Sequence, residues 1–149
     1  MTTKPAMPAV PHARPDALHI LVIEDDHNLR QTVVDALAHE GHFVRGTADG
    51  ADALEWLAEL IPDVVLLDMV MPKATVDGFE FISRLKAYPA EVRRIPLVLV
   101  SALGDSLLEA VDKASAKELH IARILPKPIQ LDKLLEVAQS VGRKPRAER

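Results

Sequence analysis

Four short apolar segments of this chain each run into residues that are suited to phosphoryl chemistry. The segments and the polar residues after them are Ile20–Ile23 before Glu24, Asp25 and Asp26, Val64–Leu67 before Asp68, Leu97–Val100 before Ser101, and Ala122–Leu125 before Lys127. In an open parallel sheet, ligands bind just outside the carboxyl ends of the strands. Acids, a hydroxyl and a lysine that reach one such edge therefore predict a site, although none of them would do so alone.

The acidic residues at this edge predict a divalent cation. Glu24, Asp25 and Asp68 would repel one another if they converged with no cation among them. Oxygen-only ligands favour a hard ion such as Mg²⁺, which would also neutralise the oxygens of an incoming phosphoryl group. Each acid taken alone also fits a role in a loop or at a helix start, and Asp26 fits the role of helix cap best.

Lys127 and Ser101 are the predicted contacts of the phosphoryl group. Pro126 and Pro128 stiffen the backbone on both sides of Lys127, which restricts where its ammonium group points. We expect this ammonium group to pair with Asp68 at rest and with a phosphoryl oxygen after transfer. Ser101 offers a hydroxyl group to another phosphoryl oxygen.

Strands that alternate with helical patterns predict the scaffold behind this edge. The strand segments are continuous apolar runs, as expected when helices cover both faces of a parallel sheet, and a weaker edge strand is expected around Phe43–Arg45. Five helices are expected on Leu29, Val33, Ala36 and Leu37; on Leu54, Leu57 and Leu60 between Asp49 and Pro62; on Phe79, Ile82 and Leu85; on Leu108, Val111 and Leu119; and on Leu131, Leu134, Leu135, Ala138 and Val141. The pattern predicts one doubly wound (βα)₅ domain of the α/β class.

Length and composition bound the rest of the molecule. A chain of 149 residues with 48% hydrophobic and 3% aromatic residues suits one domain with an aliphatic core. We expect a disordered N-terminal arm over residues 1–17, the domain over residues 18–142, and a flexible basic tail over residues 143–149.

Charge and residue usage argue against several classes of protein. The net charge of −4, with dispersed acidic residues, argues against nucleic-acid binding, which needs a basic stripe. The chain has no cysteine, which excludes disulfides and thiolate metal sites. The apolar runs are shorter than the roughly 20 residues of a membrane helix. With no stretch typical of a signal peptide, we expect a cytoplasmic protein without membrane contact.

In this order along the chain, the strand-end motifs resemble those of bacterial response regulator receiver domains of the chemotaxis-regulator type. The resemblance covers roughly residues 19–141, and the motifs are Ile23–Asp26, Leu66–Pro72 with the later Asp77-Gly78, Val100–Ala102 and Leu125–Pro128. It implies a flavodoxin-like fold, with a five-stranded parallel sheet of order 2-1-3-4-5 and helices on both faces.

The resemblance also assigns roles to individual residues. It implies that Asp68 is the phosphoacceptor and that Ser101 and Lys127 contact the phosphoryl group. It implies a Mg²⁺ site made by Glu24, Asp25, Asp68 and the backbone carbonyl of Val70. The family further suggests a cis peptide bond between Lys127 and Pro128, which X–Pro bonds tolerate.

The resemblance implies a stand-alone receiver, although the chain is also compatible with a piece of a longer regulator. Its phosphoryl donor would be a histidine kinase or a phosphotransfer protein. We expect it to signal to a downstream protein through the face between the fourth and fifth helices, as a monomer or weak dimer. It would catalyse only its own phosphorylation and dephosphorylation.

Several features distinguish this chain from the usual receiver pattern. Ile124 stands where receivers usually carry a Tyr or Phe whose ring swings inward on activation. The loop over residues 73–76 and the segment between Ser101 and Lys127 are longer than usual, so an enlarged fourth helix or following loop is expected. Val70 and Leu103 are apolar where the family positions or excludes water, which predicts slow self-dephosphorylation.

Two other functions remain open at this point. One is a Mg²⁺-dependent phosphohydrolase with Asp68 as covalent nucleophile. Such enzymes carry a second acid two residues later, where this chain has Val70, and we expect no cap domain. The other is a pseudo-receiver that binds partners without phosphorylation; the acids and Lys127 argue against it, while Ile124 leaves it open.

Overall fold

Five parallel strands form one sheet in the order β2-β1-β3-β4-β5, which confirms the predicted fold. The computed structural model describes residues 15–103, 106–111 and 113–142, so most of the expected arm and the whole expected tail lie outside the described residues. The strands are β1 (His19–Ile23), β2 (Phe43–Thr47), β3 (Val64–Asp68), β4 (Leu97–Ser101) and β5 (Ile121–Pro126).

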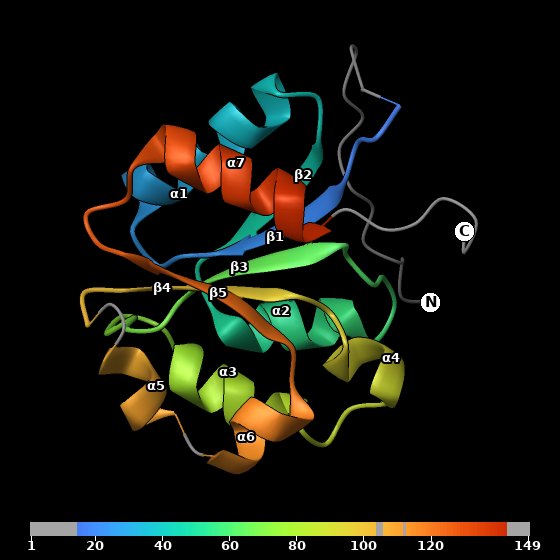
Figure 1. Cartoon of the computed structure of the whole chain (residues 1–149), viewed down its shortest axis with the longest axis vertical. Coiled ribbons are helices and arrows are strands. Elements are labelled where there is room, and N and C mark those ends of the chain that lie inside the picture. The colour runs from blue at the N-terminus through green and yellow to red at the C-terminus, as the bar shows by residue number, and fades with distance from the viewer. Residues whose placement is uncertain (1–14, 104–105, 112, 143–149) are drawn as a thin grey trace.

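Helices cover both faces of this sheet. Figure 1 shows α1 (His27–His39) and α7 (Leu131–Gly142) on one face, and α2 (Gly50–Leu57), α3 (Gly78–Leu85), α4 (Ala90–Arg93), α5 (Leu107–Ala110) and α6 (Lys113–Glu118) on the other. Because both faces are covered, β3 and β4 are buried at every position, and their sequences show no alternation. Among the described residues, no helix combines the length and the apolar character that crossing a membrane requires.

Successive residues of each strand contribute to two different cores. In β3, Leu66 packs into the core beneath α1 and α7, whereas Leu67 packs into the core on the side of α2 and α3. This alternation fixes the register, because a shift by one residue would exchange the two faces. It also fixes the point at which each strand delivers its polar residue to the carboxyl edge.

The second helix is shorter than predicted, since it ends at Leu57 and leaves Leu60 outside. The backbone N–H groups of Ala58 and Glu59 bond to carbonyls three residues back, at Glu55 and Trp56. Such bonds tighten the last turn of a helix and end it.

The predicted fourth helix is wrong as a continuous element, because two short helices take its place. Val111 lies between α5 and α6 with extended backbone angles, φ −88° and ψ 129°. Val111 and Leu119 are nevertheless both buried in the core on the α2 side. The spacing of these apolar residues therefore predicted correctly that their side chains are buried, although this segment does not form one continuous helix. The short helix α4, which precedes β4 and buries Val92, was not predicted.

Asp49 caps α2 as predicted and also holds the loop between β3 and α3. Its carboxylate accepts hydrogen bonds from the backbone N–H groups of Ala51 at 3.0 Å, Thr75 at 2.6 Å and Val76 at 2.9 Å. Desolvation raises the pKa of Asp49, but these three hydrogen bonds, together with one from the Thr75 side chain, outweigh it and leave the pKa below its usual value. A Cβ atom at Gly50 would lie 2.7 Å from the carbonyl oxygen of Val76, so this close approach requires glycine.

Candidate functional site at the carboxyl edge of the sheet

Neighbouring strands bring three predicted acids together. Ile23 of β1 pairs with Leu67 of β3, so Glu24 and Asp68 are the next residues of adjacent strands. Carboxylate oxygens of Glu24, Asp25 and Asp68 lie within 4.8 Å of one another. Glu24 is 5% exposed and Asp68 is 3% exposed, whereas Asp25 is partly exposed. Two of these three acids are therefore buried against one another at the strand ends.

Asp26 does not belong to this cluster. Its carboxylate accepts a hydrogen bond of 2.9 Å from the backbone N–H of Leu29, which makes it the N-cap of α1. This confirms the capping interpretation of Asp26.

Lys127 pairs with Asp68 at this edge. Its Nζ lies 3.0 Å from Oδ1 of Asp68, and the lysine side chain is 30% exposed. The backbone N–H of Val70 donates to the same oxygen at 3.4 Å. The other oxygen, Oδ2, is buried and has no hydrogen-bond partner. One oxygen of Asp68 is thus neutralised, while the other remains unsatisfied.

Ser101 lies beside Asp68 on the next strand. Asp68 pairs with Val100 of β4, so Ser101 is one residue farther along, and it is 1% exposed. Its Oγ accepts a 3.0 Å hydrogen bond from the backbone N–H of Leu103, which leaves the hydroxyl proton free to be donated. The backbone N–H of Lys127 bonds to the Ser101 carbonyl at 3.1 Å, and the peptide bond after Lys127 is cis, as expected.

Gly78 is required by the close approach of α3 to the site. A Cβ atom there would lie 2.5 Å from Cα of Met69 and 2.7 Å from the carbonyl oxygen of Asp68. Met69 and Met71 are 0% and 2% exposed, so they pack in the core and take no part in the site.

Backbone and side-chain donors that the sequence did not reveal hold the acids in place. Oε2 of Glu24 accepts from the N–H of Asp26 at 3.1 Å, and Oδ2 of Asp25 accepts from the N–H of Lys73 at 3.2 Å. Arg30 Nη1 donates to the carbonyl oxygen of Glu24 at 2.8 Å. The only sequence signal for Arg30 is a basic residue one helical turn after the cap of α1.

Burial raises the pKa of Glu24 to about 7, although the N–H of Asp26 opposes this shift. The neighbouring charge of Asp68 raises the pKa further, and the Lys127 cation lowers it. Burial is the main cause of this shift, and the ammonium group of Lys127, which pairs with Asp68, only partly offsets the neighbouring carboxylate.

The residues present fit a hard divalent cation. Every side-chain donor in the cluster is a carboxylate oxygen, and one oxygen of Asp68 is buried without a partner. Proteins usually bind Mg²⁺ through a few carboxylates, and the ion keeps several of its water molecules. A bound cation would also relieve the repulsion that raises the pKa of Glu24. Glu24, Asp25 and Asp68 are therefore the residues suited to hold it.

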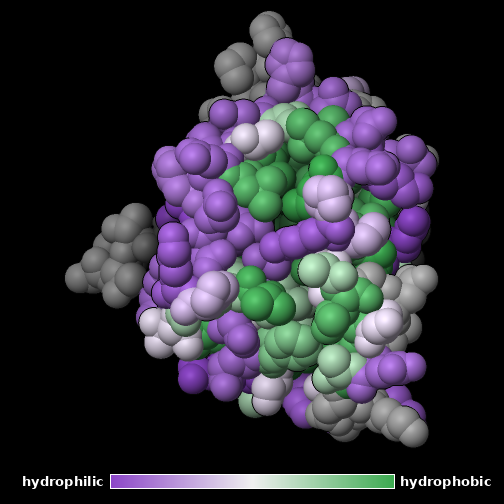
Figure 2. All heavy atoms as spheres, turned by 90° about the vertical axis from the view of Figure 1, so that its left-hand side faces the viewer, coloured by the Kyte–Doolittle hydropathy of each residue, from purple (hydrophilic) through white to green (hydrophobic). Residues whose placement is uncertain are grey.

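Two exposed apolar side chains lie at the edge that carries the site. Val70 follows β3 and is 55% exposed, and Leu103 follows β4 and is 50% exposed. Figure 2 shows this side of the molecule, where hydrophobic residues gather on both sides of a hydrophilic band. Neither side chain can hydrogen-bond a water molecule, so they cannot orient one beside Asp68.

Comparison with known sequences identifies relatives of this chain. The family model of the response regulator receiver domain matches residues 20–139. The chain is 32% identical over 123 residues to the DNA-binding transcriptional regulator NtrC of Azospirillum brasilense, over 83% of this chain and 24% of that protein. It is 30% identical over 132 residues to the response regulator MprA of Mycobacterium ulcerans, over 89% of this chain and 53% of that protein. The chain thus spans only part of the length of these curated relatives.

Solved structures show the same architecture. The chemotaxis response regulator CheY4 of Vibrio cholerae superposes with a TM-score of 0.71 at 26% identity, over 84% of this chain and 98% of that one. The receiver domain of NtrX from Brucella abortus superposes with a TM-score of 0.64 at 27% identity, over 82% of this chain and 96% of that one.

The raised pKa of Glu24 predicts a pH-dependent stability in Mg²⁺-free buffer. The folded state binds the Glu24 proton more tightly than the unfolded state, so this contribution is fully present below pH 4.5 and lost as the pH rises through about 7. The loss amounts to at most about 3 kcal/mol. Urea unfolding between pH 4.5 and 8 measures it as the difference between wild type and Glu24→Gln. Glu55→Gln, on the exposed side of α2, is the control; equal pH profiles for Glu24→Gln and wild type would contradict the assignment.

Proposed function

The chain belongs to the response regulator receiver domain family, and from this premise we propose that it accepts a phosphoryl group on Asp68 from a histidine kinase or a phosphotransfer protein. The observation that carries the proposal is the buried Asp68 carboxylate, paired with Lys127 at 3.0 Å and flanked by two further acids. Its curated relatives are described as response regulators, which supports the same reading. The proposal places the reaction in the cytoplasm.

In this mechanism, an oxygen of Asp68 attacks the phosphorus of a phosphohistidine. A P–O bond forms, the P–N bond breaks, and the departing imidazole nitrogen keeps the electron pair. Lys127 then pairs with a phosphoryl oxygen, and the hydroxyl of Ser101 donates to another. Glu24, Asp25, Asp68 and the carbonyl of Val70 would hold Mg²⁺, which would supply positive charge to stabilise the transferring group.

The site supports transfer to Asp68 over hydrolysis of a substrate. An Asp-based phosphohydrolase needs a general acid two residues after its nucleophile, and that position holds Val70, which is apolar and 55% exposed. The Lys127–Asp68 pair likewise supports phosphorylation over a receiver that acts without it. Steady turnover of a small phosphomonoester would overturn this choice.

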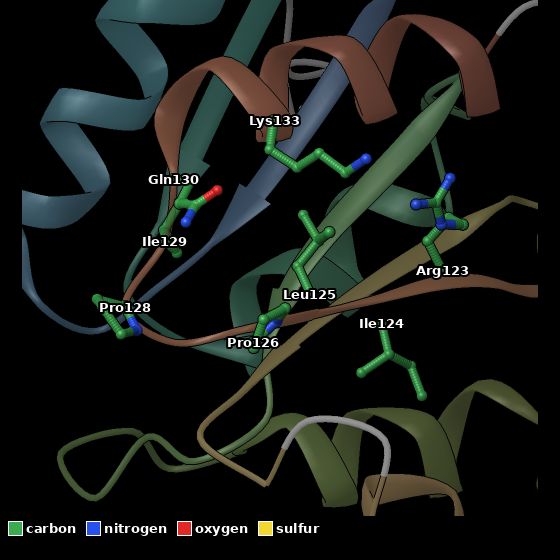
Figure 3. A pocket seen from close by; sticks show the side chains of 8 residues that line it. All are labelled: Arg123, Ile124, Leu125, Pro126, Pro128, Ile129, Gln130 and Lys133. Atoms are coloured by element: carbon green, nitrogen blue, oxygen red, sulfur yellow. The ribbon is translucent and has the colours of Figure 1, made fainter.

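We propose that the output partner binds beside β5. The proposed face is bounded by α5 and α6, which precede β5, and by α7, which follows it. A groove of about 420 Å³ lies there, lined by Arg123, Ile124, Leu125, Pro126, Pro128, Ile129, Gln130 and Lys133. Figure 3 shows Arg123, Leu125 and Lys133 on the side of β5 that faces α7, whereas Ile124 points away from α7. Two cations and no acid line this groove, so a partner surface with acidic and apolar side chains complements it.

Replacing Asp68 tests the phosphoacceptor. After incubation with acetyl phosphate and Mg²⁺, intact-mass spectrometry should show wild type with the added mass of one phosphoryl group and Asp68→Asn with none. Asp35→Asn, which removes an exposed carboxylate of α1, is the matched control and should label like wild type. Full labelling of Asp68→Asn would exclude Asp68 as the acceptor.

The apolar neighbours of Asp68 predict a long-lived phosphoryl group. Since Val70 and Leu103 cannot orient water, the phosphorylated protein should lose its label over minutes or longer in a chase followed by intact mass. Val70→Asn, which adds a side chain able to hold a water molecule, should lose it severalfold faster. Ile61→Asn changes an apolar side chain that is 40% exposed elsewhere and should match wild type. A wild-type half-life of seconds would refute the prediction.

The groove beside β5 should respond to phosphorylation. Hydrogen–deuterium exchange of peptides over residues 121–133 should change severalfold when wild type is labelled with acetyl phosphate and Mg²⁺, because Lys127 joins this segment to Asp68. The Asp68→Asn protein under identical conditions is the control and should show no change. Unchanged exchange over residues 121–133 in fully phosphorylated wild type would argue against this output face.

A further inference from the structure

Arg30 reaches back from the first turn of α1 to the loop that follows β1. Its Nη1 donates to the carbonyl oxygen of Glu24 at 2.8 Å, in a partly buried contact. Its Nη2 lies 3.2 Å from Nδ1 of His27, which lies one turn earlier on the same helix. Its own backbone N–H bonds to the carbonyl of Asp26 at 2.9 Å. The guanidinium group is thus fixed over the turn that contains Glu24, Asp25 and Asp26.

The backbone of Glu24 is held on both sides. Its N–H donates to the carbonyl of Thr47 at the end of β2 at 3.0 Å, and its C=O accepts from Arg30. A charged donor makes the second hydrogen bond stronger than a neutral one. With both backbone groups bound, the rotation that aims the Glu24 and Asp25 side chains at Asp68 is restricted.

Gly46 provides the space through which the Arg30 side chain passes. A Cβ atom at Gly46 would lie 3.3 Å from Cγ and 3.4 Å from Cδ of Arg30, and 3.0 Å from Cγ2 of Val34. The φ angle of Gly46 is not in the left-handed region, since Gly41 is the only described glycine with positive φ. Close packing against α1, and not backbone geometry, therefore favours glycine at this position of β2.

We propose that Arg30 is a positioning residue for divalent-cation binding, acting through the backbone of Glu24. This inference rests on the proposed function, because it assumes that Glu24, Asp25 and Asp68 hold the cation. Residues that orient metal ligands by hydrogen bonds, without binding the metal themselves, typically contribute a factor of about 10 to 100 in metal affinity. The side-chain hydrogen bonds of Arg30 go to the Glu24 carbonyl and to His27 and not to a carboxylate of the cluster, so we assign it a role in orienting the ligands through the backbone.

The positive charge of Arg30 should weaken Mg²⁺ binding, whereas its hydrogen bond to Glu24 should strengthen it. Replacing Arg30 therefore separates the two effects. A cation near the carboxylates opposes binding of Mg²⁺ by Coulomb repulsion, so removing that charge by itself would strengthen binding. Loss of the hydrogen bond to Glu24 would instead weaken binding, because the turn would lose its preferred geometry. The sign of the change therefore identifies which role dominates.

The test measures the dissociation constant of Mg²⁺ directly, by amide chemical shifts in a titration of the phosphoryl-free protein. Arg30→Met, which keeps the length of the side chain, should bind Mg²⁺ about 10-fold more weakly than wild type. Arg30→Lys keeps the charge and one donor group and should fall between the two. Arg84→Met removes an exposed arginine paired with Glu80 on α3 and should bind like wild type.

Gly46→Ala provides an independent variant that leaves the charge of Arg30 intact. Its added Cβ should press on Cγ2 of Val34 and on the Arg30 stem, so that the stem shifts and Mg²⁺ binding weakens severalfold. The spectrum of the metal-free protein reports that each variant is folded. Wild-type affinity or tighter binding in Arg30→Met would overturn the role of Arg30 and leave the proposed function standing. A wild type that binds no Mg²⁺ would instead overturn the proposed function.

Discussion

Like charges crowded at the end of a buried sheet constrain everything else in this molecule. Glu24 and Asp68 are almost fully buried and share one edge with Asp25, while the ammonium group of Lys127 pairs with Asp68. A buried charge that loses its partner destabilises a protein by about 3 to 5 kcal/mol. The arrangement is therefore complete only when the remaining negative charge is neutralised, by a proton on Glu24 or by a cation. A site with unsatisfied negative charge is also one that a cation and a phosphoryl group can enter together.

The scaffold resists this repulsion because rigid elements fix each acid. The strand order places β1 beside β3 and β3 beside β4, so residues far apart in sequence arrive at one edge in fixed register. Around that edge, Gly78 lets α3 approach the backbone of Asp68, and Asp49 holds the loop that precedes α3. Arg30, on α1, restrains the loop after β1 by donating a hydrogen bond to the Glu24 carbonyl. Each contact restrains backbone and leaves the carboxylate oxygens available.

The strands and the convergence of the acids followed from the sequence because both depend on a local signal. A buried strand is a run of apolar residues, and the residue after it must lie at the carboxyl edge. Helix boundaries were less predictable, since Val111 is buried like a helical core residue although its backbone is extended. Apolar spacing reports which side chains are buried, and it does not report where backbone hydrogen bonds stop. Contacts such as Arg30 to the Glu24 carbonyl were missed for a related reason, because they depend on the path of a turn between two elements.

The proposed function requires a route by which a receiver with an aliphatic residue at position 124 transmits its state. Ile124 packs against the core on the α2 side and has no ring whose rotation can report the occupancy of Ser101. Lys127, however, is joined to both sides: its Nζ binds Asp68, and its backbone N–H binds the Ser101 carbonyl. The flanking Pro126 and Pro128 line the groove beside β5. In the proposed mechanism, a shift of Lys127 from Asp68 to a phosphoryl oxygen moves a stiff segment that is itself part of the partner surface. The partner then selects between two positions of this segment, and the population shift requires only that it binds one of them more tightly.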